Sequence, residues 1–243
     1  MPSLKGWVNM FKREHHQIIE QVLHLLNADL LREHQCYFGG GTAIALRFGE
    51  YRESVDIDFL VSDLPSYRAL RNLVREKTGV MALFKPDATI LSQRREVRAD
   101  QYGIRTAIGL GQHVIKFEIV LEGRIALAIP APTDEVCGVP TLGLVDLFAS
   151  KLLANSDRWA DEGVFNRDVI DLAMMNPGIE ILSAARTKAE TAYGAAICAD
   201  LEKAIDKLLQ KPGWLERCMR TMKMDNTMPA QLVTSLNRLR NSV

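Results

Sequence analysis

Cysteine is scarce in this sequence, and no two of its cysteines lie close together along the chain. The four residues are Cys36, Cys137, Cys198 and Cys218, and none belongs to a C-x-x-C pair. This spacing argues against both a zinc framework and a disulfide framework. It is typical of a protein of the reducing cytoplasm, which is the compartment we expect.

Long hydrophobic runs are also missing. No apolar stretch approaches the length of a membrane span, and the N-terminal segment MPSLKGWVNMFKREHH lacks the apolar core of a signal peptide. We therefore expect no membrane partner. Hydrophobic residues make up 47% of the 243 residues and charged residues 25%, an ordinary globular mixture that fits one large domain or two small ones.

The chain has no net charge, because 30 basic residues balance 30 acidic ones. It is not a polycation, so any attraction to nucleic acid has to come from local patches. Residues 202–243 hold eight lysines and arginines against four acidic residues, and a second basic cluster lies between Arg94 and Arg105. Each cluster is either a phosphate-binding surface or an ordinary solvated face.

The most informative stretch runs from Phe38 to Leu60 and reads FGGGTAIALRFGEYRESVDIDFL. Its glycines predict a tight turn that exposes backbone N–H groups, followed by a short apolar helix. Outward-facing N–H groups at such a turn form a cradle for phosphate. Gly40, Gly41 and Thr42 are therefore candidate contacts for the phosphates of a nucleotide.

Asp56 and Asp58 lie two residues apart within an apolar strand pattern, Val55 to Val61. Side chains alternate along a strand, so both carboxylates project from the same face, and Ser54 shares that face. Two neighbouring anions repel unless a cation lies between them, and oxygen ligands favour Mg²⁺ or Mn²⁺. A phosphate cradle beside metal-binding carboxylates indicates nucleotide chemistry.

This glycine turn followed by Asp-x-Asp resembles the signature of the nucleotidyltransferase superfamily. The version here, GGTAIALRF followed by RES-DIDF, is most similar to the AbiEii/AbiGii toxin family, which includes the MenT-like toxins. The resemblance is strong over Phe38 to Val61 and extends more weakly to about Leu172. It implies a toxin of a toxin–antitoxin system that uses a nucleoside triphosphate and Mg²⁺ to modify its target, and therefore a cognate antitoxin protein.

The resemblance implies an α+β fold, a polymerase-beta-like mixed sheet with flanking helices followed by a C-terminal helical domain. Two proline clusters between Pro130 and Pro140 place the boundary. We expect residues 1–135 to form the nucleotidyltransferase domain with an N-terminal helix over Leu4 to Leu31. Residues 136–243 should form a helical domain that completes the active site.

Three further residues enter through the resemblance. The strand His113 to Leu121 places Glu118 between apolar neighbours, an unfavourable position for an unpartnered charge. Glu118 is either a third metal-binding carboxylate, which the superfamily often has, or the partner of a nearby arginine or of Lys116. A downstream lysine followed by Arg-Asp-x-x-Asp-Leu corresponds to Lys151 and Asp168, and implies that Lys151 neutralises triphosphate charge while Asp168 orients the lysine or the nucleotide.

The remaining candidates and alternatives concern the substrates. Arg52 contacts phosphate or pairs with a nearby glutamate. The family resemblance implies that the acceptor is RNA, specifically the 3′ end of tRNA. A small-molecule acceptor, as in antibiotic-modifying nucleotidyltransferases, and a catalytically inactive transferase-fold binding module are the alternatives. Steep salt dependence of binding distinguishes RNA from a small acceptor.

Overall fold

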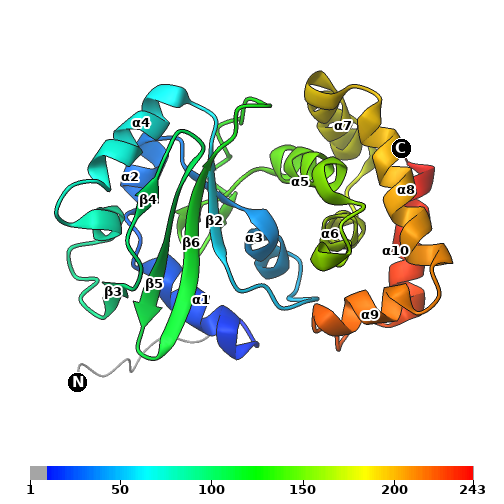
Figure 1. Ribbon diagram of the computed structural model, residues 1–243, viewed down its shortest axis with the longest axis horizontal. Helices are drawn as coiled ribbons and strands as arrows, with labels where there is room; N and C mark the ends of the chain where they lie inside the picture. Colours follow the sequence, from blue (N-terminus) through cyan, green and yellow to red (C-terminus); the bar gives the residue numbers. More distant parts are fainter. Residues whose placement is uncertain (1–9, 243) are drawn as a thin grey trace.

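The computed structural model describes residues 10–242 and is built around a six-stranded mixed sheet (Figure 1). The strands follow the order β1-β2-β6-β5-β3, and β4 pairs with β5 alone. Their bounds are β1 (Tyr37–Gly39), β2 (Ile57–Val61), β3 (Leu91–Gln93), β4 (Arg98–Ala99), β5 (Gly103–Leu110) and β6 (His113–Leu121). Strands β2 and β6 are parallel, whereas the other pairings are antiparallel.

Helices cover both faces of this sheet and then form a separate layer (Figure 1). Helices α2 and α4 lie on one side, and α3 lies on the other side, facing α5 and α6. Helices α7 to α10 form the outer layer. The helices are α1 (Glu14–His24), α2 (Ala28–Glu33), α3 (Gly40–Arg47), α4 (Leu64–Leu73), α5 (Leu144–Arg158), α6 (Arg167–Met175), α7 (Ile179–Tyr193), α8 (Ala196–Gln210), α9 (Trp214–Thr221) and α10 (Pro229–Asn241).

The predicted α+β class, with a central mixed sheet, flanking helices and a helical C-terminal part, is confirmed. The strand predicted for His113 to Leu121 is β6, and its residues alternate as expected: Ile115, Phe117 and Ile119 are fully buried, whereas Lys116 is exposed. Alternation therefore fixes which face of β6 carries Glu118.

The single N-terminal helix predicted for Leu4 to Leu31 is wrong over its described part. The chain forms α1 and then α2, and Asn27 caps α2 by accepting a hydrogen bond from the backbone N–H of Leu30. An asparagine at this position favours a new helix start over continuation. Residues 4–9 of the predicted helix lie outside the described residues.

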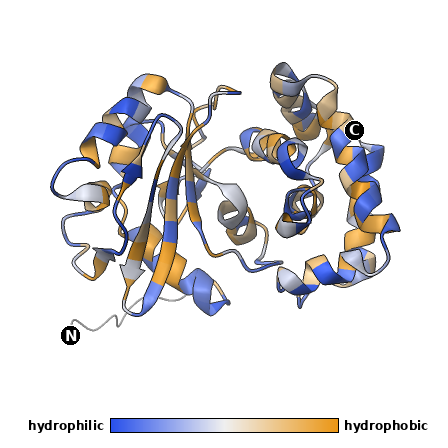
Figure 2. Cartoon of the chain, viewed as in Figure 1, coloured by the Kyte–Doolittle hydropathy of each residue, from blue (hydrophilic) through white to orange (hydrophobic). Residues whose placement is uncertain are grey.

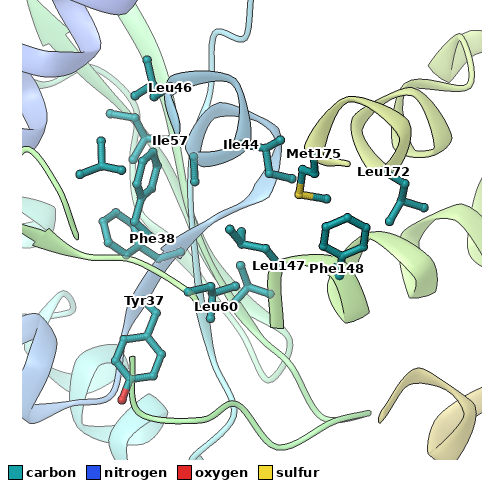
Figure 3. Packing of buried hydrophobic residues seen from close by; sticks show 14 of the residues in the cluster. Tyr37, Phe38, Ile44, Leu46, Ile57, Leu60, Leu147, Phe148, Leu172 and Met175 are labelled. Atoms are coloured by element: carbon teal, nitrogen blue, oxygen red, sulfur yellow. The ribbon is translucent and has the colours of Figure 1, made fainter. Parts of the chain in front are cut away.

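The hydrophobic core continues from the sheet into the helical layer. Figure 3 shows Phe38 and Ile57 of the sheet on one side, with Leu147 and Phe148 of α5 and Leu172 of α6 on the other. Burial of this continuous apolar surface holds the two walls of the site described below in register. The division into residues 1–135 and 136–243 stays a prediction.

The outer helices pack through one face only. In Figure 2, the ribbons of α8 and α9 alternate between hydrophobic and hydrophilic bands. Ile205 of α8 and Cys218 of α9 are fully buried. Within the described part of the chain, no helix is long and apolar enough to cross a membrane. Between the sheet and α5, a short hairpin is formed by β7 (Glu135–Val136) and β8 (Val139–Pro140).

Candidate active site

A cleft of about 270 Å³ opens between the sheet and helices α3, α5 and α6. Its sheet wall contains Asp56, Asp58 and Glu118, and its helical wall contains Lys151 of α5 and Arg167 of α6. Gly40, Gly41, Arg52 and Ser54 line the end where the α3 turn lies. The structure thus brings nine of the ten predicted site residues to one cleft or its immediate wall, the nine being Gly40, Gly41, Arg52, Ser54, Asp56, Asp58, Glu118, Lys151 and Asp168.

The glycine turn lies directly against the sheet wall of the cleft. Gly39 pairs with Asp58 across β1 and β2, and Gly40 follows with a φ of +68°, a conformation that favours glycine. A Cβ atom on Gly40 would lie 2.7 Å from Asp58 Oδ2, and one on Gly41 would lie 2.2 Å from Arg52 Nη2. Side chains are therefore excluded here, and the first backbone N–H groups of α3 remain available at the cleft.

Asp56 lies just before β2 and Asp58 lies within it, so the predicted pair does point into one cleft. Burial, together with the nearby carboxylates of Asp56 and Glu118, raises the pKa of Asp58 to about 6, although Lys116 and Lys151 act against this shift. The cause is that burial and like charges both disfavour the ionised form. Ionised Asp58 is therefore costly in this wall unless a further cation lies beside it.

Glu118 lies beside Asp58 in the parallel β2–β6 register and beside Arg105 in the antiparallel β5–β6 register. Its carboxylate accepts a hydrogen bond from Arg105 Nε at 2.6 Å and pairs with Lys116 Nζ at 2.7 Å. The ion pair that was the alternative for Glu118 is thus present. Metal ligation by Glu118 stays a prediction.

Lys151 is buried in the opposite wall, where its Nζ lies 2.8 Å from Asp168 Oδ1 and 2.7 Å from Asp171 Oδ2. Arg158 adds two further bonds to Asp168, at 2.6 and 3.0 Å. Burial by itself would raise the pKa of Asp168, but Lys151 and Arg158 outweigh it and hold this pKa well below its usual range. Asp168 is therefore ionised and accepts a hydrogen bond from Lys151, which lines the cleft.

Arg52 connects the glycine turn to this buried network. Its guanidinium donates two hydrogen bonds to Asp171, at 2.7 and 2.9 Å, and the Tyr51 hydroxyl donates to the same carboxylate. Arg52 and Lys151 together keep the pKa of Asp171 below its usual value despite complete burial. The guanidinium is thus fixed beside Gly41, at the edge of the cleft.

Thr42, the tenth predicted residue, is fully buried behind the cleft wall. Its hydroxyl lies 2.9 Å from Ser54 Oγ and 2.5 Å from the carbonyl oxygen of Asp56, so it ties α3 to the start of β2. His16 supports the same segment, because its Nε2 accepts from the Ser54 N–H at 3.1 Å and its Nδ1 donates to Glu50 at 2.8 Å. His16 looks like part of a polar surface in the sequence, yet it is fully buried.

Two further cations line the site. Lys116, the partner that the sequence offered for Glu118, does pair with it and also lies near Asp58 and Asp56. Arg167, at the first turn of α6, has no hydrogen-bond or ion-pair partner within residues 10–242 and lines both the main cleft and a smaller one of about 170 Å³. The smaller cleft shares Arg52, Ser54 and Asp56 with the main one.

The acidic wall fits a divalent cation. Asp56 and Asp58 offer only oxygen donors, and burial together with the neighbouring carboxylates raises the pKa of Asp58, a cost of ionisation that a hard cation beside it would relieve. The oxygens of Asp56, Asp58 and Glu118 do not all come within 4.8 Å of one another; in the described part of the chain, the one triad that meets this distance is Glu20, His24 and Cys137. Asp56 and Asp58 stay the predicted ligands of this ion.

Two aspartates at the start of β2 share one cleft with a glycine-initiated helix, which is the arrangement that the nucleotidyltransferase motif in the sequence predicts. The chain belongs to the family described as "Nucleotidyl transferase AbiEii toxin, Type IV TA system", whose model matches residues 24–229. Membership confirms the family resemblance and the enzyme class. It implies a nucleoside triphosphate substrate, a divalent metal ion and an antitoxin partner.

Two solved structures are similar to the chain at low identity. A putative nucleotidyltransferase from H. pylori has 14% identity and a TM-score of 0.49, and the match covers 93% of each chain. JHP933 from Helicobacter pylori has 15% identity and a TM-score of 0.47, with 95% of this chain and 94% of that one covered. No protein among the curated sequences matches.

Proposed function

We propose that this toxin transfers a nucleotide from a nucleoside triphosphate to RNA, with the 3′ end of tRNA as acceptor and Mg²⁺ (or Mn²⁺) as the metal ion. The observation that carries the proposal is the opposite charge of the two cleft walls. Asp56, Asp58 and Glu118 face two cations, Lys116 and Arg105, and so retain a net negative charge.

The helical wall has the reverse balance. Asp168 and Asp171 are matched by three buried or half-buried cations, Lys151, Arg158 and Arg52, and Arg167 adds a fourth. A positive wall opposite a negative one suits a triphosphate bound together with a divalent cation. Backbone N–H groups at Gly40 and Gly41 are the additional contacts that we assign to the β- and γ-phosphates.

The residues then have separate tasks. Asp56 and Asp58 hold the metal ion, which when bound neutralises charge on the phosphates and orients them. Lys151 and Arg52 neutralise the triphosphate, and Ser54 lies within reach of a phosphate oxygen. The acceptor hydroxyl forms the new bond to the α-phosphorus as the bond to the leaving pyrophosphate breaks, and its proton passes to a carboxylate of the aspartate pair.

The smaller cleft is our candidate for the acceptor. This cleft extends from α9 to Asp56, which also lines the main cleft. An acceptor bound in it would therefore meet the donor at Asp56 and Arg167. Beside it, Phe165 stacks on Trp214 with ring centroids 6.1 Å apart, and Lys211 and Arg217 lie over the Trp214 ring. Trp214 is buried, so of these two rings Phe165 is the one that could stack on an RNA base, with Arg217 lying over it.

The test is incubation of the purified protein with each labelled nucleoside triphosphate, Mg²⁺ or Mn²⁺, and total RNA. We expect label on an RNA of tRNA length, released by mild digestion as a 3′-terminal nucleotide. Asp56→Ala should give none, with an unchanged circular dichroism spectrum. RNA affinity should fall steeply as salt rises.

The two alternatives give different results. A small-molecule nucleotidyltransferase leaves RNA unlabelled and shows turnover that depends little on salt. An inactive binding module gives no product with any triphosphate, and calorimetric titration with nucleotide and Mg²⁺ shows no binding at the cleft. Either result overturns the proposal.

A further inference from the structure

A second group of metal-ligand side chains lies away from the catalytic cleft. Glu20 and His24 lie one turn apart on α1, and Cys137 lies in the turn of the β7–β8 hairpin. One ligand atom from each comes within 4.8 Å of the other two. Residues four apart share a helical face, so α1 presents its carboxylate and imidazole together to the hairpin thiol.

The surroundings of Glu20 indicate that this group lacks a cation. Its carboxylate is buried and accepts from the backbone N–H of Met10 at 3.2 Å, while His24 Nε2 lies 3.9 Å away. In the described part of the chain, no lysine or arginine nitrogen pairs with it. A buried carboxylate is costly without a charged partner, and a metal ion in this position provides one.

The hairpin holds Cys137 in a fixed place. Its two turn residues, Cys137 and Gly138, both have positive φ, 54° and 76°, the conformation of a tight two-residue hairpin. Arg32 of α2 donates to the Gly138 carbonyl at 3.2 Å and pairs with Glu135, which anchors the hairpin beside the N-terminal helices. The thiol is thus presented by a rigid element.

We propose that Glu20, His24 and Cys137 bind a zinc-class divalent ion that fastens the β7–β8 hairpin to helix α1. One oxygen, one nitrogen and one sulfur ligand match the preferences of Zn²⁺, and they differ from the oxygen-only ligands of the catalytic cleft. Three protein ligands leave the fourth tetrahedral position to water. The ion would link the N-terminal helix to the segment that leads into α5 and Lys151.

The test uses Co²⁺ and Zn²⁺ on the full chain carrying Asp56→Asn and Asp58→Asn, which removes metal binding at the catalytic cleft. Cobalt bound by Cys137 gives a thiolate-to-metal charge-transfer band that carboxylate ligands cannot give. We expect this band at one Co²⁺ per chain, displaced by one Zn²⁺, and a Zn²⁺-dependent rise in melting temperature.

Cys137→Ser should abolish the band and weaken Zn²⁺ binding by more than the roughly 10–100-fold that loss of a supporting partner of a metal ligand costs. Cys198→Ser, which changes another half-buried thiol, is the matched control and should behave as the parent. His24→Ala is the second variant, in case Cys137→Ser folds poorly by circular dichroism. A Co²⁺ complex without the band, or equal Zn²⁺ binding by the two serine variants, overturns the proposal.

Discussion

At the scale of single residues, the site depends on carboxylates that are held in unequal surroundings. Asp58 has its pKa raised to about 6 by burial and neighbouring acids, whereas Asp168 has its pKa lowered by Lys151 and Arg158. Asp58 is therefore the acid that a further cation would stabilise, whereas Asp168 already has two cations beside it. This difference separates the proposed metal ligands from the residues that orient Lys151.

Asp58→Asn should stabilise the metal-free protein while it abolishes nucleotidyl transfer. The folded-state pKa of about 6 exceeds the ordinary 3.8, so ionisation of Asp58 costs stability as pH rises through this interval. In EDTA at pH 7.5 we expect a gain of about 1–2 kcal/mol in unfolding free energy, measured by urea denaturation, which disappears below about pH 4. Mg²⁺ should stabilise the parent but not the variant.

The matched control is Asp29→Asn, which changes an aspartate with 97% side-chain exposure at the surface. It should leave both activity and stability nearly unchanged. A variant Asp58→Asn that is less stable than the parent in EDTA at pH 7.5 would contradict our account of the acidic wall.

Lys151→Ala should weaken nucleotide binding more than RNA binding. Its ammonium group is the buried cation of the helical wall, and a charge-assisted contact of about 1.5–3 kcal/mol corresponds to a loss of roughly 10–100-fold in nucleotide affinity. Calorimetric titration with nucleotide and with RNA measures both. Lys203→Ala, at an exposed lysine paired with Asp200, is the control, and a larger loss for RNA than for nucleotide would place Lys151 on the acceptor side.

At the scale of elements, the site is assembled along the connection from β1 to β2, which begins with α3. The chain turns at Gly39 and Gly40, enters α3, and returns along Glu50 to Asp56 to start β2 beside the strand it left. His16 and Thr42 hold this return segment from behind. The glycine turn and the aspartates are therefore positioned by the same short stretch of backbone.

Gly41→Ala tests how closely these elements meet. Helix propensity alone predicts that alanine stabilises α3 by about 1 kcal/mol. A Cβ atom at this position would lie 2.2 Å from Arg52 Nη2, so we expect instead a loss of about 1–3 kcal/mol and weaker nucleotide binding. The sign of the change in urea denaturation decides between them.

Gly123→Ala is the control for this experiment, because a Cβ atom there meets nothing within 4 Å. Its unfolding free energy should stay within about 0.5 kcal/mol of the parent. If Gly41→Ala is as stable and as active as the parent, the close approach of α3 to Arg52 is not a constraint.

At the scale of the whole molecule, a buried ion network joins the sheet half to the helical half. Arg52 comes from the segment before β2, whereas Asp171 comes from α6, and Lys151 of α5 contacts the same carboxylate. Because charged groups join the two halves, the stability of the folded protein depends on pH. Folded-state pKa values below the ordinary range add stability above about pH 4, and this stability is lost as pH falls further.

Asp171→Asn should therefore destabilise the protein by about 3 kcal/mol at pH 7, because it leaves Arg52 and Lys151 without their shared carboxylate. Its loss of stability between pH 5 and pH 3 should be smaller than in the parent. Urea denaturation across this pH range measures both effects. Asp206→Asn removes an exposed pair with Arg240 and should cost at most about 1 kcal/mol; equal effects of the two substitutions would exclude a special role for the network.

What the sequence determined by itself is local. Glycine spacing predicted the phosphate-facing turn, strand periodicity placed Asp56 and Asp58 on one face of their strand and Glu118 opposite the apolar face of its own strand, and the motif order identified the family. These features follow from backbone geometry over a few residues, where spacing decides direction. The prediction of one helix that continues past Leu25 is wrong, because the local cap at Asn27 outweighed an apolar period that continued beyond it.

Only the tertiary structure decided how distant residues meet. Sheet register set Arg105 beside Glu118, burial turned His16 inward, and packing of α6 against α3 brought Asp171 to Arg52. The Glu20, His24 and Cys137 group likewise arises from a helix and a hairpin far apart in the chain. Such contacts depend on how whole elements pack to bury the shared core, a property that no local spacing encodes.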